Sequence, residues 1–150
     1  MTANWKNRKV LVTGAGGFIG SRLCERLVEA GASVSAFVRY TSQPEPGLLR
    51  FISRQAFNEI AFIRGDLRDF NAVEQSVDGV DTVFHLGALI SIPYSYVHPV
   101  ETVQTNVLGT MNVLEACRKH GAKLVHTSTS EVYGTAQRVP IDENHPLQGQ

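Results

Sequence analysis

The chain contains 150 residues, the size of one domain that can bury a sizeable core without disulfides or metal. Hydrophobic residues make up 43% and charged residues 19%, which is typical of a folded globular protein rather than a disordered one. Fourteen basic and fourteen acidic residues give a net charge of zero, which argues against a nucleic-acid partner. No apolar run approaches the ~20 residues of a membrane helix, so no membrane partner is expected.

The N-terminus, the cysteines and the histidines predict a cytoplasmic protein without a metal site. Residues 1–9 are polar and lack the apolar core of a secretory signal. Cys24 and Cys117 fall on apolar helical stripes, which favours buried thiols in a reducing compartment. The five histidines show no metal-ligand spacing. His85 and His126 fall in predicted strands and are expected to be core or supporting groups.

The predicted elements alternate between strands and helices. Apolar runs predict strands at 10–13, 33–38, 60–63, 82–86 and 123–127. Helical periodicity predicts helices at 18–30, 47–58, 69–77 and 101–120, the last with Val107, Met111, Leu114 and Cys117 on one stripe. This alternation predicts an α/β protein with a doubly wound parallel sheet, the Rossmann fold, with helices on both faces. Ligands of such folds bind beyond the carboxyl ends of the strands.

A glycine-rich loop joins the first strand to the first helix. Gly14 permits a tight turn, Gly17 lets the backbone approach a pyrophosphate, and Gly20 lets the helix pack closely on the strand. Free backbone N–H groups at the helix start, where Phe18 and Ile19 lie, would hold the anion together with the helix dipole. No Lys-Ser or Lys-Thr pair follows, so the loop is not a P-loop. The pattern predicts dinucleotide binding.

The second strand bears on the choice of cofactor. An NAD site usually carries an acidic residue about 20 residues after the glycine loop, but none occurs from position 31 to position 44. Arg39 follows the strand instead and could pair with the 2′-phosphate of NADP. The same arginine could also stack on the adenine or be solvated. The sequence therefore favours NADP slightly and leaves NAD open.

Five motifs in order resemble the extended branch of the short-chain dehydrogenase/reductase superfamily, the nucleotide-sugar epimerases and dehydratases. They are the glycine loop and the segments 65–69 (GDLRD), 85–88 (HLGA), 106–116 (NVLGTMNVLEA) and 128–134 (STSEVYG). The segments 92–96 (IPYSY) and 146–150 (PLQGQ) are most similar to 4,6-dehydratases that act on UDP- or GDP-N-acetylglucosamine. The resemblance covers essentially the whole chain. It implies a nucleotide-sugar substrate and a homodimer formed through helices such as the one that begins at Glu101.

The resemblance also assigns roles to particular residues. It implies cofactor contacts by a set that follows the strands: Asp66, Leu67, Leu86, Gly87, Ala88, Asn106 and Thr127. Asp66 would meet the adenine amino group, although it could equally be a turn residue. Ser91, Tyr94 and Tyr96 would contact the substrate, unless they belong to an ordinary surface loop.

The catalytic residues implied by the resemblance are only partly present. A Tyr-x-x-x-Lys pair is expected beside the nicotinamide, but none of the four tyrosines is followed by lysine at that spacing. Thr129 matches the residue that holds the substrate hydroxyl, and Glu131 matches a proton-transferring carboxylate. Ser130 stands where dehydratases usually have aspartate, which keeps epimerisation, decarboxylation and a non-catalytic binding domain open. Residues 1–134 are thus predicted to form the dinucleotide-binding domain, and 135–150 a loop leading to a catalytic helix and substrate domain outside this chain.

Overall fold

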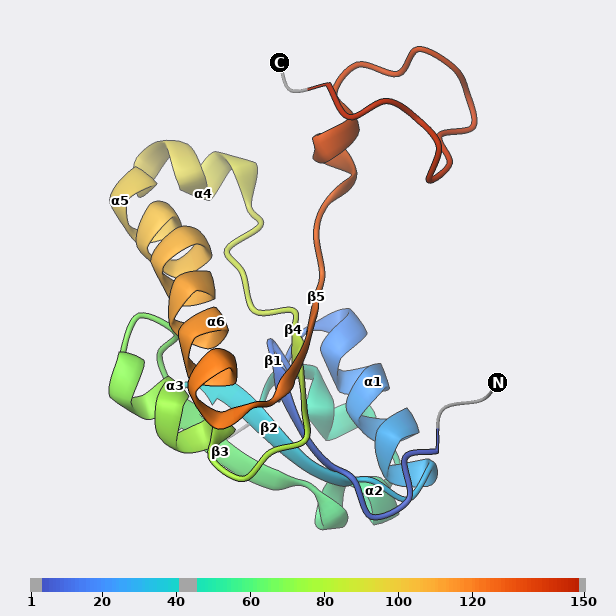
Figure 1. Ribbon diagram of the computed structural model, residues 1–150, viewed down its shortest axis with the longest axis vertical. Coiled ribbons are helices and arrows are strands. Elements are labelled where there is room, and N and C mark those ends of the chain that lie inside the picture. Colours follow the sequence, from blue (N-terminus) through green and yellow to red (C-terminus); the bar gives the residue numbers. More distant parts are fainter. Residues whose placement is uncertain (1–3, 41–45, 149–150) are drawn as a thin grey trace.

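The computed structural model describes residues 4–40 and 46–148. Its five strands are β1 (Lys9–Thr13), β2 (Ser33–Arg39), β3 (Ala61–Gly65), β4 (Thr82–His85) and β5 (Lys123–His126). All neighbours pair in parallel in the order β3-β2-β1-β4-β5 (Figure 1). The chain moves outward from β1 to β3 and then crosses back to β4, so the strand order reverses beside β1. The predicted doubly wound α/β fold is confirmed.

Helices cover both faces of this sheet. The longer ones are α1 (Phe18–Glu29), α3 (Phe70–Val77) and α6 (Gly109–His120). The short ones are α2 (Arg54–Glu59), α4 (Ile92–Val97), α5 (Pro99–Val103), the 3₁₀ turns η1 (Gly47–Phe51) and η3 (Ser130–Tyr133), and the π turn η2 (Gln104–Leu108). The helices α1 and α2 with η1 pack on one face, whereas α3 and α6 pack on the other. Residues 149–150, the end of the segment PLQGQ, and positions 41–44 of the range without an acidic residue lie outside the described residues.

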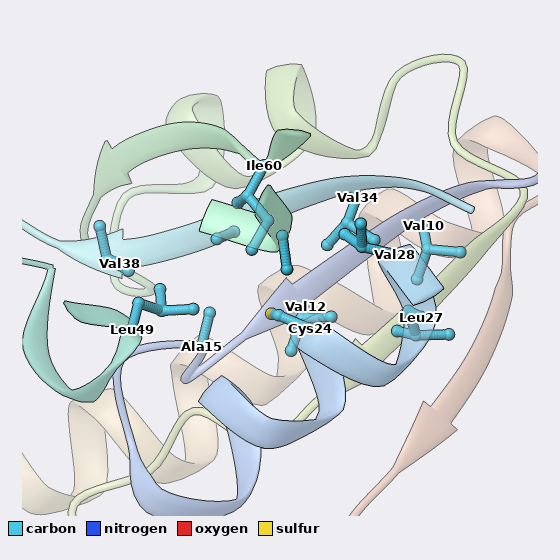
Figure 2. Packing of buried hydrophobic residues seen from close by; sticks show 12 residues of the cluster. Val10, Val12, Ala15, Cys24, Leu27, Val28, Val34, Val38, Leu49 and Ile60 are labelled. Carbon is cyan, nitrogen blue, oxygen red and sulfur yellow. The ribbon is translucent and has the colours of Figure 1, made fainter. Parts of the chain in front are cut away.

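Alternating residues along the strands pack into two hydrophobic cores, one on each face of the sheet. Val10 and Val12 of β1 pack against α1, where Cys24 and Leu27 are buried (Figure 2). Leu11, between the two valines, points to the opposite core formed with α3 and α6. Because side chains alternate along a strand, one short apolar run can serve both faces of a parallel sheet.

The segment 47–58 is not the single helix that its apolar residues predicted. Ile52 has extended backbone angles and separates η1 from α2. Ser53 then caps α2 by accepting a hydrogen bond from the Ala56 amide. The buried carboxylate of Glu25, on α1, accepts a 2.9 Å bond from the Ser53 amide, and this bond lowers the pKa of Glu25. This long-range contact, which periodicity cannot register, holds the break in place.

The long helix also differs from its prediction. It begins at Pro99 and continues through the π turn η2 into α6. Its buried residues are Gly109, Val113, Ala116 and Cys117, whereas Val107, Met111 and Leu114 are about half exposed. The helix packs through a different face from the predicted stripe and shares only Cys117 with it, so the stripe was wrong at its other residues. The helix α4 was not predicted. Ser91 caps its N-terminus, where the Ser91 hydroxyl accepts a hydrogen bond from the Tyr94 amide.

Both cysteines are buried and unpaired, as expected. Burial raises the pKa of Cys24 to about 12, so its thiol stays protonated. Among residues 4–40 and 46–148, no helix is long and apolar enough to cross a membrane. The same residues contain no cluster of three or more metal-ligating side chains.

Leu49 and Leu48 provide a test of the way η1 packs. Leu49 is fully buried in the α1 core, whereas its neighbour Leu48 is 36% exposed. We expect Leu49→Ala to lower the free energy of unfolding by about 2–5 kcal/mol, because it leaves a cavity. Leu48→Ala should change it by about 0.5 kcal/mol or less. Urea denaturation of both variants measures the difference, and equal effects would contradict the described packing of η1.

Candidate functional site

A cleft of about 380 Å³ opens at the carboxyl ends of β1, β2 and β3 and beside the loop that follows β4. Its volume falls in the range of small-molecule sites. It lies where the strand order reverses, the position at which doubly wound sheets bind ligands. The residues lining it are Gly14, Gly16, Gly17, Phe37, Val38, Arg39, Pro46, Gly47, Arg64, Gly65, Asp66, Leu67, Gly87, Ala88, Leu89 and Thr105.

The glycine loop forms one wall of the cleft through close backbone contacts. Gly14 has a φ of +68°, and a Cβ there would lie 2.8 Å from the backbone of Leu86 and Gly87. A Cβ on Gly20 would lie 2.2 Å from the Gly14 carbonyl oxygen, so α1 can pack here only with glycine. Gly17 caps α1 and lines the cleft. The loop thus presents bare backbone and a helix N-terminus, which suit an anionic group such as a pyrophosphate.

A chain of hydrogen bonds ties the loop after β4 to the long helix. The Gly87 amide donates to the Thr13 hydroxyl at 3.1 Å, and the same hydroxyl is hydrogen-bonded to Nδ1 of His85 at 2.6 Å. The Thr110 hydroxyl donates to the Asn106 carbonyl at 2.7 Å, so it accepts from Nε2 of His85 at 3.0 Å. These directions define the neutral Nε2–H tautomer of His85.

Burial is the main reason that the pKa of His85 falls from its ordinary 6.5 to about 4, and the stacked ring of His126 contributes. A protonated His85 would also lose its bond from Thr13, because both ring nitrogens would then be donors. His85 is 1% exposed, as expected of a core group. His126 lies on the edge strand β5 and is exposed, so it is not a core group, although its ring stacks on His85.

The π turn brings Asn106 against the loop after β4. Its side-chain amide accepts from the Leu89 amide at 2.7 Å and donates to the Leu89 carbonyl at 2.9 Å. Thr105, the preceding residue, lines the cleft. Gly109 lets the helix approach Leu67, since a Cβ at this glycine would lie 2.9 Å from the Leu67 Cβ. The π turn therefore shapes the cleft, consistent with the frequent placement of such turns at functional sites.

Four charged side chains gather at the β2 and β3 side of the cleft. Arg39 donates to Glu101 on α5 at 2.5 Å, and the Tyr94 hydroxyl donates to the other oxygen of Glu101 at 2.5 Å. Arg68 binds Asp66 through two nitrogens, at 2.9 and 2.5 Å, and lies 3.7 Å from Glu101. The bond from Arg68 lowers the pKa of Asp66, and the bond from Tyr94 lowers the pKa of Glu101. Both carboxylates are therefore charged at neutral pH.

The structure brings part of the predicted cofactor set together. The predicted residues that line the cleft are Gly14, Gly17, Arg39, Asp66, Leu67, Gly87 and Ala88. The other predicted residues lie around it: Gly20 packs on Gly14, Leu86 packs into the α1 core, and Asn106 holds Leu89. The Phe18 and Ile19 side chains are 85% and 64% exposed and line a second hollow of about 780 Å³ beside α1.

The predicted catalytic residues lie on the segment that follows β5, outside the lining of the cleft. The Thr127 amide extends the sheet by donating to the His85 carbonyl. Thr129, Ser130 and Glu131 are exposed, and the Thr129 hydroxyl accepts a bond from the Glu131 amide at 3.3 Å. Figure 1 shows this segment extending beyond the sheet and folding back near the C-terminus.

The segment that folds back near the C-terminus is held together by contacts among its own residues. His145 is buried, and its Nε2 accepts from the Gln137 amide at 3.0 Å. The Tyr133 ring lies edge-on to this imidazole, with 5.7 Å between the ring centroids. Within the segment that was predicted as a loop, residues 135–148 are thus held by contacts of their own.

Of the predicted substrate residues, only Tyr94 takes part in the charged cluster. Ser91 caps α4, and Tyr96 is 83% exposed. Sequence reasoning missed Glu101, Thr13 and Thr110, which act through contacts with residues 62, 72 and 25 positions away, respectively. It also missed Arg64, which lines the cleft at the end of β3 beside Gly65, the first residue of the predicted motif 65–69. The sequence signal for Arg64 was its position directly after the predicted strand 60–63.

His85 predicts a dependence of stability on pH. Because folding lowers its pKa, protonation favours the unfolded chain; its contribution is intact above pH 6.5 and is lost as the pH falls to 4. The loss should reach about 3 kcal/mol in the free energy of unfolding. We expect His85→Asn to remove this part of the pH dependence, measured by urea denaturation between pH 4 and 7. His98→Asn, at an exposed histidine on the linker between α4 and α5, serves as control, and an unchanged pH slope in His85→Asn would contradict the burial of His85 in its neutral form.

Comparison with known proteins agrees with this geometry. A family described as GDP-mannose 4,6 dehydratase matches residues 11–150. A 2-alkyl-3-oxoalkanoate reductase of Stenotrophomonas maltophilia is 44% identical over 142 residues, which cover 94% of this chain and 37% of that protein. UDP-glucuronic acid decarboxylase 1 of Arabidopsis thaliana is 35% identical over 141 residues, which cover 93% of this chain and 30% of that enzyme. The chain thus spans about a third of these relatives.

A solved structure shares the fold. The UDP-glucose-4-epimerase from Stenotrophomonas maltophila, with bound NAD and formylated UDP-arabinopyranose, aligns with a TM-score of 0.81 at 27% identity. The alignment covers 95% of this chain and 43% of the epimerase. The glycine loop, the cleft at the strand reversal and the family match over residues 11–150 lead to one conclusion. The chain belongs to the GDP-mannose 4,6-dehydratase family, within the NAD-dependent epimerase/dehydratase group of the short-chain dehydrogenase/reductases, and corresponds to its N-terminal part.

Proposed function

We propose that this chain is the cofactor-binding part of an enzyme that oxidises a nucleotide-sugar carbon by hydride transfer to NAD or NADP and then eliminates water. The observation that carries the proposal is the cradle formed by Gly14, Gly17 and Gly20, where side chains would fill the space next to a helix N-terminus. The epimerase that shares the fold binds NAD, which supports a nicotinamide dinucleotide.

The lining residues fit the parts of such a cofactor. The backbone around Gly17 would bind the pyrophosphate, and Leu67 would pack against the adenine. Arg39 would face the adenosine ribose and Asp66 the adenine amino group, whereas Gly87 and Ala88 would lie under the nicotinamide side. When bound, the nicotinamide accepts a hydride. The chain itself supplies the orientation, through the backbone of the glycine loop and through the loop that Thr13 and Asn106 hold.

The catalytic proposal joins this cleft to the segment after β5. Thr129 would position the sugar hydroxyl, and Glu131 would move the proton of the neighbouring carbon. The base expected beside the nicotinamide, a tyrosine with a lysine four residues later, is not encoded in these 150 residues. We therefore expect the chain by itself to turn over no nucleotide sugar, and the full enzyme to need residues beyond it.

Specific observations support other outcomes at the same site. Ser130 in place of an aspartate, together with the related UDP-glucuronic acid decarboxylase, supports decarboxylation as an alternative to dehydration. The epimerase that shares the fold supports 4-epimerisation. The 44% identical oxoalkanoate reductase supports a second candidate, reduction of a ketone, which uses hydride transfer without elimination. The behaviour of Glu131 separates elimination from simple reduction.

Assembly and location form part of the proposal. Val100, Val103, Val107, Met111 and Leu114 leave an exposed apolar surface along α5, η2 and α6. Such a surface supports a homodimer, because large exposed apolar patches mark association sites. The two unpaired, buried cysteines support a cytoplasmic location.

Gly17 tests dinucleotide binding. Its φ of −81° and ψ of 177° are accessible to valine, but the added side chain would stand beside the loop backbone. We expect Gly17→Val to keep the fold and abolish binding of NAD and NADP, measured by titration calorimetry and circular dichroism. Ser33→Val, at the amino end of β2 and therefore at the opposite end of the strand from the cleft, should bind normally. Unchanged affinity in Gly17→Val would refute the assignment of the loop.

Glu131 tests the elimination step in the full-length enzyme. If Glu131 moves the proton of the neighbouring carbon, Glu131→Gln should slow dehydration by about 10²–10⁴-fold. Transient nicotinamide reduction by a UDP- or GDP-hexose should persist, observed by stopped-flow absorbance. The control is Glu143→Gln, an exposed carboxylate on the loop 135–148. Normal dehydration by Glu131→Gln, or loss of the reduction step as well, would contradict the assigned role.

A further inference from the structure

We propose that Glu101, a carboxylate contributed by α5, makes this site select NAD over NADP, an inference that rests on the proposed dinucleotide-binding function. The sequence pointed to Arg39 as a partner for a 2′-phosphate because no acidic residue follows β2. The structure shows that an acidic group is nevertheless present beside Arg39. It comes from a helix 62 residues further along the chain.

The contacts of Glu101 distinguish it from a loose surface ion pair. Its side chain is 21% exposed, and each of its two oxygens has a partner. Arg39 donates to Oε1 and the Tyr94 hydroxyl donates to Oε2, both at 2.5 Å, while Arg68 lies 3.7 Å from Oε1. The hydrogen bond between Tyr94 and Glu101 also raises the pKa of Tyr94, so the tyrosine remains a donor at neutral pH. Glu101 is thus held in place from two elements, β2 and α4.

The charges in this cluster cancel. Arg39 and Arg68 contribute two positive charges, and Asp66 and Glu101 contribute two negative charges. A ribose 2′-hydroxyl is neutral and can donate to a carboxylate, the role that an acidic residue plays at NAD sites. Glu101 supplies that carboxylate from α5 in place of the residue that β2 lacks.

A 2′-phosphate would meet a different balance. It carries about −1.5 to −2 charges at pH 7. To pair with Arg39 it must either approach the Glu101 carboxylate or displace it, and displacement would leave the Tyr94 hydroxyl without its acceptor. Like charges placed together are a common means of rejecting a competing ligand. The arrangement therefore opposes NADP although an arginine lines the cleft.

The test compares the affinities of NAD and NADP by titration calorimetry. In the wild-type chain NAD should bind more tightly than NADP. Glu101→Gln keeps an acceptor for Tyr94 but removes the charge, so the affinity for NADP should rise about tenfold or more, while that for NAD should fall because the ribose hydroxyl loses its charged acceptor. High salt should reduce the gain, because it screens the phosphate from Arg39. Glu115→Gln on α6, whose carboxylate pairs with Arg118, is the matched control.

Arg39→Ala completes the cycle. In the double variant with Glu101→Gln, the gain in NADP affinity should disappear, since Arg39 is the partner that the phosphate would reach. The pair of 5′-AMP and 2′,5′-ADP should reproduce the selectivity, because these fragments carry only the adenosine end of the two cofactors. Wild-type preference for NADP, or equal effects of Glu101→Gln on both cofactors, would overturn the proposal for Glu101. Failure of the wild type to bind either dinucleotide would instead refute the proposed function on which it rests.

Discussion

Close contact between bare backbone segments is the constraint on which the cleft depends. The loop after β1 lies against the loop after β4, and the first turn of α1 lies against the loop after β1. Glycine is required at Gly14 and Gly20 because any Cβ would collide with main-chain atoms that cannot move aside. The same contact leaves peptide N–H groups and a helix N-terminus facing the cleft. One steric condition therefore both fixes the loop at the carboxyl end of β1 and leaves a backbone surface that suits an anion.

Hydrogen bonds of polar side chains, to one another and to the backbone, hold the opposite wall of the cleft, which is the loop after β4. His85 is buried in its neutral form and relays hydrogen bonds between Thr13 and Thr110, and hence between β1 and the long helix. Asn106 holds the backbone of Leu89 through both groups of its amide. These bonds are buried or partly buried, and a buried polar group that lacks a partner is costly. The loop after β4 therefore has little freedom. The wall is organised before any ligand arrives.

The charged side of the cleft follows a different principle. Arg39 of β2, Glu101 of α5, and Asp66 and Arg68 of the loop after β3 neutralise one another. An arginine beside a cofactor site is commonly interpreted as a phosphate partner, but its charge is available only if no carboxylate reaches it first. Selectivity is then decided by the balance of the cluster rather than by one residue type.

The sequence alone determined the fold class and the anion-binding wall, because both follow from local features: apolar runs of strand length, helical periodicity and glycines at fixed spacing. It could not determine which face of the long helix is buried, because the helix carries apolar residues on two faces and only its packing against α3 selects one. Nor could it pair Glu101 with Arg39 or choose the tautomer of His85. Such pairings join residues 62 and 72 positions apart, and only the packing of the elements brings their atoms within hydrogen-bonding distance.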